Sequence, residues 1–343
     1  MRVSSEPARP AEWLIPLGEP IIALTGSPDS AQIAALTTEG KLVIVEAATG
    51  RIFHELAAHP SGGFRVAWHP KAHLVASSGA DGQVKFWDPA TGKLLRQISL
   101  GTAWVEELEW SPTGAWLAVA AGRIVTLLTP DFDVKHTLKN HVSTVTGLGW
   151  RTDGQVLGVA CYGGVQLYEA RTGQPTELLP WKTSLVSLGW SPDQRWVVAG
   201  TQDMSVQIWP LPFHEGDELA MNGYPFKVRE LAWHHSGKYL ATGGDQQILV
   251  WDFSGEGPAG TTPQILVGHT ARIAALAYQS GGQLLASGGQ DGRLLWWNVR
   301  HPAPLGESQF AAPLTAVRWS RNDKTVIVGG QDGTVALVTP ITK

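Results

Sequence analysis

Short apolar runs separated by turn residues fill the chain from one end to the other. Runs such as residues 74–77 and 83–88 are rich in residues that favour strands, and a turn ending in Asp-Gly joins them. No window shows the 3.6-residue periodicity of a helix over a helical length. The pattern therefore predicts an all-β protein built from short strands and tight turns.

The apolar pattern repeats with a period of about 40 residues. One copy holds a His, a Ser, an Asp and a Trp separated by 18, 4 and 6 positions: His269, Ser287, Asp291 and Trp297. The same residue types recur at the same spacing: His59, Ser77, Asp81 and Trp87. Sliding this template along the chain aligns eight anchor positions, 40 to 45 residues apart: Gly26, Trp68, Trp110, Trp150, Trp190, Trp233, Tyr278 and Trp319. A fixed period of this length indicates a repeat architecture in which each copy stacks on its neighbours.

These repeats resemble the WD-repeat (Trp-Asp repeat) β-propeller family, in which about 40 to 45 residues form one four-stranded blade. The resemblance rests on Trp-Asp pairs, a Gly-His pair and a series of Asp turns: Trp87-Asp88, Trp251-Asp252, Gly268-His269, Asp81, Asp203, Asp245, Asp291 and Asp332. It implies that in the two complete copies a chain of hydrogen bonds runs from the Trp indole through Ser and His to the turn Asp. That role is structural.

The two ends of the chain are complementary. Residues 12–17 form a predicted strand before the first repeat, while the last repeat ends after residues 334–338 without an outer strand. We expect the N-terminal strand to pair with the last blade and close the ring, which removes open strand edges. The count is then eight four-stranded blades, or seven if the first repeat, with Gly26 in place of Trp, is not a blade. Residues 1–10 are predicted to be a disordered lead to one domain over residues 11–343.

Some repeats depart from the template. The third and fourth lack the turn Asp, at residues 120–123 and 162–164, so we expect hydrophobic packing to replace the internal network there. The longest connections, residues 210–224 and 253–263, are candidates for mobility or partner contact.

Composition narrows the class of function. A formal net charge of −4 and a pI near 6.3 offer no basic excess for nucleic acid or an anionic membrane. The single cysteine, Cys161, excludes an intramolecular disulfide and a Cys-based zinc cluster. The chain has no apolar signal-peptide core and no run of about 18 apolar residues. We therefore expect a cytoplasmic protein that contacts neither nucleic acid nor membrane.

No catalytic motif stands out. Residues 255–260 match G-x-G-x-x-G, but no helix follows to hold a pyrophosphate. His234 and His235 are adjacent, and neighbouring strand residues point to opposite faces, so they are interpreted as turn or surface residues rather than metal ligands. The recurring Asp turns fit a structural role better than a catalytic one, which is needed only once or twice. We predict no enzymatic activity, no cofactor and no metal.

The resemblance also implies where a partner binds. In the family, side chains 6 and 4 positions before each anchor, together with residues just before the turn Asp, tend to surround the narrow face of the channel. The candidates are Phe64, Trp104, Glu106, Trp181, Gln202, Lys227, Arg229, Arg272, Gln290 and Gln331. Trp104 and Trp181 are the two tryptophans that no core position explains; the alternative is that they pack on neighbouring loops. The hypothesis is a monomeric interaction scaffold for a protein or peptide partner, and the alternative is a small-ligand-binding or enzymatic propeller that uses the central channel.

Overall fold

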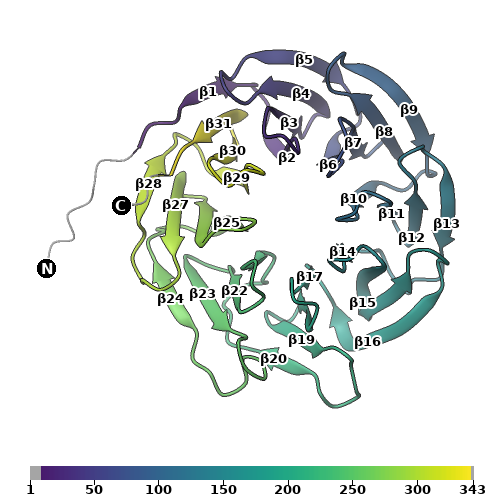
Figure 1. The fold of residues 1–343 in the computed structure, drawn as a ribbon, viewed down its shortest axis with the longest axis vertical. Helices are drawn as coiled ribbons and strands as arrows, with labels where there is room; N and C mark the ends of the chain where they lie inside the picture. Colours follow the sequence, from purple (N-terminus) through teal and green to yellow (C-terminus); the bar gives the residue numbers. More distant parts are fainter. Residues whose placement is uncertain (1–8, 341–343) are drawn as a thin grey trace, which may run out of the picture.

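The computed structural model describes residues 9–340, and in them the chain forms 31 strands and no helix. The strands build eight sheets that stand as blades around a central axis (Figure 1). Within a blade, consecutive strands pair in antiparallel fashion from the axis outward. The fold is a β-propeller. The prediction of eight blades is confirmed, and the alternative of seven is wrong.

The blades are numbered here in chain order, and in each the first strand is innermost. The first strands are β2 (Ile21–Gly26), β6 (Gly63–Trp68), β10 (Val105–Trp110), β14 (Gly147–Trp150), β17 (Gly189–Trp190), β21 (Leu231–Trp233), β25 (Ile273–Tyr278) and β29 (Leu314–Trp319). The second strands are β3 (Gln32–Thr37), β7 (Val75–Gly79), β11 (Leu117–Ala121), β18 (Trp196–Gly200), β22 (Tyr239–Thr242), β26 (Leu284–Gly289) and β30 (Val326–Gly330).

The third strands are β4 (Lys41–Glu46), β8 (Gln83–Asp88), β12 (Ile124–Leu128), β19 (Val206–Pro210), β23 (Gln247–Asp252), β27 (Arg293–Asn298) and β31 (Thr334–Val338). The outer strands are β5 (Ile52–Ala57), β9 (Lys93–Ser99), β13 (Val134–Leu138), β16 (Pro175–Ser184), β20 (Leu219–Met221), β24 (Gln264–Val267), β28 (Gly306–Gln309) and β1 (Trp13–Pro16). In blade four a single long strand, β15 (Val156–Glu169), takes the place of both the second and the third strand.

The core lies between blades rather than inside any one of them. Every residue of β7 is buried, because neighbouring blades cover both of its faces, whereas β9 at the rim is almost wholly exposed. Eight apolar clusters result, each shared by two adjacent blades. In one of them Phe86 of blade two packs beside Trp110 of blade three. A single repeat cannot bury its own apolar surface, so the copies fold only as a stack.

The N-terminal strand closes the ring. Strand β1 pairs with β31, with Trp13 opposite Leu337 and Pro16 opposite Thr334 (Figure 1). The Trp13 indole also donates a 2.9 Å hydrogen bond to the Ala47 carbonyl of blade one. The closure predicted from the complementary ends of the chain is therefore confirmed.

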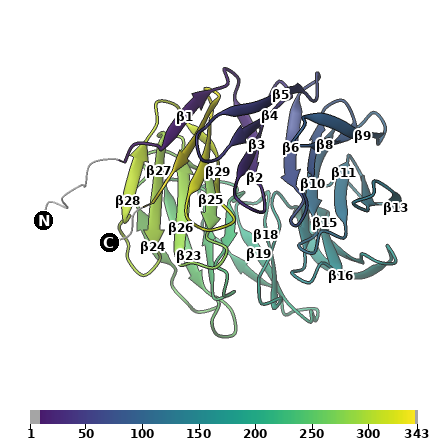
Figure 2. The same cartoon turned by 45° about the horizontal axis from the view of Figure 1, so that its top comes forward.

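The ring has two distinct faces, between which the strands run (Figure 2). At one face, named the start face here, the first strands begin and the turns between second and third strands lie, since Gly63 pairs with Gly79 and the Asp81 turn follows at once. At the opposite face, named the end face, the first strands end. Five first strands carry a β-bulge near the start face, in β2, β6, β10, β25 and β29. A bulge re-aims the extra residue, which is Phe64 in β6 and Glu106 in β10.

Two sequence expectations concern less regular segments. The connection predicted over residues 210–224 contains the outer strand β20, whose three residues are too few to show an alternating pattern. Most of the predicted disordered lead, residues 1–8, lies outside the described residues. Within residues 9–340 no helix is long and apolar enough to cross a membrane.

Candidate functional site

An arc of exposed apolar side chains crosses the start face from blade three to blade six. Its five members, named the apolar arc here, have exposed fractions between 45% and 63%: Trp104, Val142, Tyr162, Met204 and Phe226. Four of them stand on loops and turns, with Trp104 directly before β10 and Met204 in the turn between β18 and β19 at a φ of 59°, whereas Tyr162 lies where β15 continues through the turn of blade four. Large apolar side chains exposed together on one face typically mark an interaction site.

Contacts link some neighbouring parts of the apolar arc. The Trp104 ring lies 5.6 Å from the ring of Phe64, the bulge residue of blade two. Val142 borders the Gly163 turn, and the Tyr162 amide beside it donates to Ser143 Oγ at 2.9 Å. Trp104 therefore extends the apolar surface toward blade two, and Val142 and Tyr162 lie close together in blade four.

Charge differs between the two ends of the apolar arc. Arg272 lies 5.8 Å from the Phe226 ring, and its Nη2 donates to the Lys227 carbonyl at 3.4 Å. Arg229 is exposed beside them, whereas Glu106 sits at the blade-three end. Three basic side chains therefore gather at the blade-six end, whereas blade three carries both the partly buried Glu106 and the exposed Arg123 of its start-face turn.

The structure places the predicted partner-binding residues unevenly. Phe64, Trp104 and Glu106 gather at one end of the apolar arc, and Lys227, Arg229 and Arg272 gather at the other.

The remaining predicted partner-binding residues lie elsewhere. Trp181 is half-buried and packs against the apolar cluster between blades four and five, so much of its ring serves packing rather than partner binding. Gln202 is exposed beside Met204, whereas Gln290 and Gln331 are exposed in polar turns of blades seven and eight.

Sequence reasoning missed four members of the apolar arc: Val142, Tyr162, Met204 and Phe226. Each is a large apolar residue in a turn at the start face. A search for apolar residues inside turns would have found them, whereas the offsets from each anchor did not.

The His, Ser, Asp and Trp of the two complete copies form hydrogen-bonded chains. In blade two, Trp87 Nε1 donates to Ser77 Oγ at 2.9 Å, and His59 bridges Ser77 at 2.8 Å and Asp81 at 2.9 Å. In blade seven, Trp297 Nε1 and His269 both lie 2.8 Å from Ser287 Oγ, and His269 is 3.1 Å from Asp291. These chains tie the second strand, the third strand and the turn of one blade to the loop that enters it.

Burial sets the charge of these chains. It lowers the pKa of His59 and of His269, and the neighbouring Asp residues only partly oppose the shift. Burial by itself would raise the pKa of Asp81, but hydrogen bonds and charge from His59 and Lys85 outweigh it and hold that pKa below its usual value. Each group is thus held in place by its partners and has none of its hydrogen-bonding capacity directed at solvent.

Blade four uses a substitute for the missing network, which corrects for that blade the expectation that hydrophobic packing alone suffices. Tyr168 Oη lies 3.1 Å from His141 Nε2, and the other ring nitrogen of His141 bonds to the Arg123 carbonyl. Blade five keeps its turn Asp, and there Thr183 Oγ1 accepts from Trp181 Nε1 and donates to Asp203.

Comparison with known proteins agrees with this geometry. A family model described as "WD domain, G-beta repeat" matches residues 50–88, 219–252, 260–298 and 307–337, and one described as "Anaphase-promoting complex subunit 4 WD40 domain" matches residues 123–193. Together the two models match strands of every blade, although in blade one they match only β5. The chain belongs to the WD-repeat β-propeller family.

Curated relatives of this WD-repeat propeller are distant. The WD repeat-containing protein AAC3 of Dictyostelium discoideum is 27% identical over 168 residues, 46% of this chain and 35% of that protein. Actin-interacting protein 1 of Caenorhabditis elegans is 24% identical over 78% of this chain and 46% of its own length. Protein transport protein sec13 of Aspergillus clavatus is 26% identical over 62% of this chain and 87% of its own. The first curated relatives are matched over only 35% to 37% of their length.

A solved structure shows the same fold over nearly the whole chain. The crystal structure of the computationally designed Ika8 protein superposes with a TM-score of 0.81 at 21% sequence identity, covering 95% of this chain and 98% of that one. This likeness concerns the fold alone.

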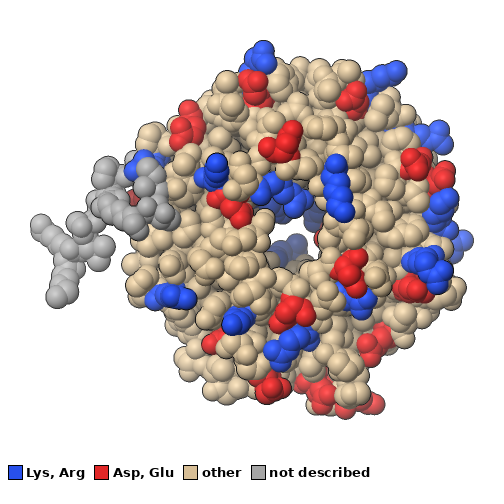
Figure 3. All heavy atoms as spheres, in the orientation of Figure 1, with Lys and Arg blue, Asp and Glu red and all other residues tan. Residues whose placement is uncertain are grey.

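The channel of this WD-repeat propeller carries a few charged groups on an otherwise small-residue wall. Arg65 bonds to Glu107 at 2.7 Å, with Glu109 next along β10, and Lys and Arg atoms reach the open channel (Figure 3). Burial raises the pKa of Glu107 and of Glu109, the latter to about 8. Blade four presents only Gly147 and Gly149 at the corresponding positions.

Arg65 and Glu107 are paired with each other, so they direct much of their hydrogen-bonding capacity at one another rather than at a small molecule. In residues 9–340, no group of three or more His, Cys, Asp or Glu side chains could hold a metal ion.

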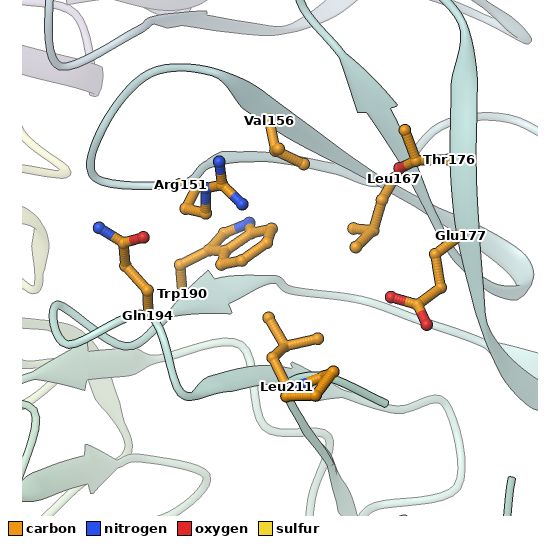
Figure 4. Close-up of a pocket in the computed structure, with 9 residues that line it drawn as sticks. Arg151, Val156, Leu167, Thr176, Glu177, Trp190, Gln194 and Leu211 are labelled. Carbon is orange, nitrogen blue, oxygen red and sulfur yellow. The ribbon is translucent and has the colours of Figure 1, made fainter. Parts of the chain in front are cut away.

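A groove opens between blades four and five, away from the apolar arc. It has a volume of about 630 Å³ and an apolar floor of Val156, Leu167, Trp190 and Leu211. Figure 4 shows Arg151 and Gln194 at one end of the groove and Thr176 and Glu177 at the other. Arg151 and Gln194 follow β14 and β17, so the groove belongs to the end face and the rim.

Proposed function

We propose that this WD-repeat propeller is a cytoplasmic interaction scaffold, without catalytic activity of its own, that binds a protein or peptide partner through the apolar arc. The observation that carries the proposal is the exposure of five large apolar side chains in one strip of the start face. Water solvates such a strip poorly, and covering it with a partner recovers the free energy of burial. Trp, Tyr and Arg, the residue types enriched at binding hot spots, all occur there.

Three further points support the proposal. The polar residues of the two complete repeats are engaged in hydrogen bonds with one another, so they do not offer a catalytic set. One relative, Actin-interacting protein 1, carries a protein partner in its name. The single cysteine permits no intramolecular disulfide, which suits a reducing compartment and a monomeric chain.

The channel supports the alternative of an enzyme or small-ligand binder less well. Burial raises the pKa of Glu107, Glu109 and Glu230 and lowers that of Arg318, and shifted pKa values are typical of an active site. Glycine and alanine, rather than further functional groups, occupy much of the remaining wall.

The test compares two triple variants as bait in the native host. Changing Trp104, Tyr162 and Phe226 to Ala removes the three aromatic members of the apolar arc. The matched control changes Leu95, Leu178 and Ile265 to Ala; these residues have similar exposure but lie on outer strands. We expect both variants to fold like the wild type and only the first to lose partners identified by mass spectrometry, by about tenfold or more. Equal recovery of every partner by both variants would remove the apolar arc from consideration.

A further inference from the structure

Neighbouring blades meet in a recurring slot at the end face. Each slot is formed by the anchor of one blade, a residue from the loop after its third strand, and residues from the second and third strands of the preceding blade. Between blades two and three, the slot holds Leu74, Phe86, Phe132 and Trp110. Between blades five and six, it holds Trp196, Ile208, Phe253 and Trp233.

Aromatic side chains fill these two slots. Phe132 lies 4.6 Å from Phe86, ring to ring, in the first slot. Phe253 lies 5.5 Å from Trp196 and 4.7 Å from Trp233 in the second. The phenylalanine side chain from the loop after the third strand thus fills the space between the two blades.

The slot between blades four and five keeps its anchor, Trp190, but has lost the other large side chains. Val156 and Leu167 stand at the strand positions, and Leu211 replaces the phenylalanine of the loop. Side chains of this size leave the groove of about 630 Å³ open (Figure 4). That volume lies within the range of ligand pockets, about 300 to 1,000 Å³.

The electrostatic character of the groove is acidic. Arg151 is bound by Asp153 through contacts of 2.7 to 3.1 Å, so its charge is largely neutralised within its own turn. Among residues 9–340, by contrast, nothing pairs with the Glu177 carboxylate at the other end. The loop that leaves the groove wall at Pro212 carries three more exposed carboxylates: Glu215, Asp217 and Glu218. In Figure 3, acidic atoms gather at the rim in the region of β19 and β20.

We propose that this groove is a second docking site, and that its occupant is a short peptide segment with aliphatic or aromatic side chains flanked by Lys or Arg. The apolar floor around Trp190 receives the apolar side chains, and Glu177 with the acidic loop receives the basic ones. The groove is open along its length at the surface, which suits an extended segment better than an enclosed small molecule. Its position on the end face leaves it free when the apolar arc is occupied, so the proposal does not depend on that arc.

The test uses a defined probe. A fluorescein-labelled, end-blocked hexapeptide of two lysines, two leucines and two lysines is titrated with the purified chain, and binding is followed by fluorescence anisotropy. Comparison peptides replace the lysines by serine or by glutamate, or the leucines by serine. We expect saturable binding of the lysine-leucine peptide, weaker binding of every comparison peptide, and loss of affinity with added salt.

Three variants locate the binding. Leu211→Phe fills the groove as Phe132 fills the slot between blades two and three, and we expect it to weaken binding about tenfold or more. Glu177→Gln weakens binding about fivefold, and Glu177→Lys shifts the preference toward the glutamate peptide. Because Glu177 is half-buried at the surface, its variants keep the proposal falsifiable even if Leu211→Phe fails to fold. Glu39→Gln, which removes an exposed carboxylate from blade one, is the charge-matched control and leaves binding unchanged.

Other outcomes overturn the proposal. Binding of the lysine-leucine peptide that is equal in wild type, Glu177→Lys and Leu211→Phe places the peptide elsewhere, and an absence of saturable binding removes the site. A wild-type dimer in size-exclusion chromatography that Leu211→Phe converts to a monomer identifies a second copy of this chain as the occupant. The triple variant of the apolar arc binds the peptide like the wild type; if it does not, the two sites are not independent.

Discussion

Glu109 stands on β10 near Glu107, and both carboxyl groups are partly buried in the wall of the channel. Burial raises the pKa of Glu109 from 4.5 to about 8, the charge of Glu107 adds to the shift, and Arg65 opposes it. Between pH 4.5 and 8 the folded state therefore binds more protons here than the unfolded state does. Because stability falls with rising pH wherever the folded state binds more protons, this residue destabilises the fold progressively across that window.

Glu109→Gln replaces the carboxyl by a neutral group of the same shape. We expect the variant to melt at nearly the wild-type temperature at pH 5 and several degrees higher at pH 8 to 9, because it never carries the buried charge. The measurement is a series of thermal unfolding curves from pH 5 to pH 9.

The control is Glu55→Gln on the outer strand of blade one, where the carboxylate is about half exposed. It reports the general effect of removing one negative charge. Parallel curves for wild type and Glu109→Gln across the pH series would contradict the prediction.

Within a blade, the hydrogen-bonded chain of Trp87, Ser77, His59 and Asp81 ties β7 and β8 to the entering loop. Ser77 Oγ is the centre of that chain, since it contacts both the indole and the imidazole. The next residue, Ser78, is equally buried on the opposite side of the strand, but its hydroxyl has no hydrogen-bond partner. One strand thus contains a paired and an unpaired serine.

Ser77→Ala leaves two buried donors or acceptors unsatisfied, so we expect a loss of about 1 to 3 kcal/mol in the free energy of unfolding. Ser78→Ala removes a buried hydroxyl that bonds to nothing, and we expect no loss or a slight gain. Chemical denaturation of both variants gives the two free energies. Equal losses would show that the chain of hydrogen bonds adds little to the cohesion of the blade.

Strands that pack on both sides, and the N-terminal rim strand, could be predicted from the sequence, whereas the shortest strands could not. Strand β8 is apolar and follows an Asp-Gly turn, so its type and position follow from local pattern. Strand β20 has only three residues, and residues 211–218 connect it to its partner β19. Its conformation therefore depends on pairing with β19 rather than on its own pattern. In blade four, the missing turn Asp gave no hint that β15 continues through the turn.

The residues of the candidate site also divide into those that could be predicted from the sequence and those that could not. Trp104 could be predicted, because it and Trp181 are the two tryptophans that no core position of the repeat explains. Tyr162 and Met204 stand where the second strand passes into the third, and that segment has no periodicity from which exposure can be derived. The groove depends on how the volumes of Leu167 and Leu211 compare with those of Phe86 and Phe132, and these residues meet only once the blades are assembled.

At the scale of the whole molecule, stability depends on ring closure. Strand β1 supplies the outer edge of blade eight, and Trp13, Ile15 and Leu17 pack on the cluster shared by blades eight and one. Without β1, the edge of β31 lies open, and an unpaired edge is a template for association between molecules.

Deleting residues 1–18 should therefore destabilise the entire ring rather than one blade. Loss of three partly buried apolar side chains costs about 3 to 6 kcal/mol, which for a chain of 343 residues corresponds to a fall of roughly 4 to 8 °C in melting temperature. Differential scanning calorimetry measures the fall, and light scattering on heating measures the association expected from the open edge. Leu14→Ser is the matched control, because Leu14 lies on the same strand with its side chain about half exposed, so its replacement leaves the pairing intact. An unchanged melting temperature after the deletion would mean that the blades hold together without closure, and that the pairing of β1 with β31 is incidental to stability.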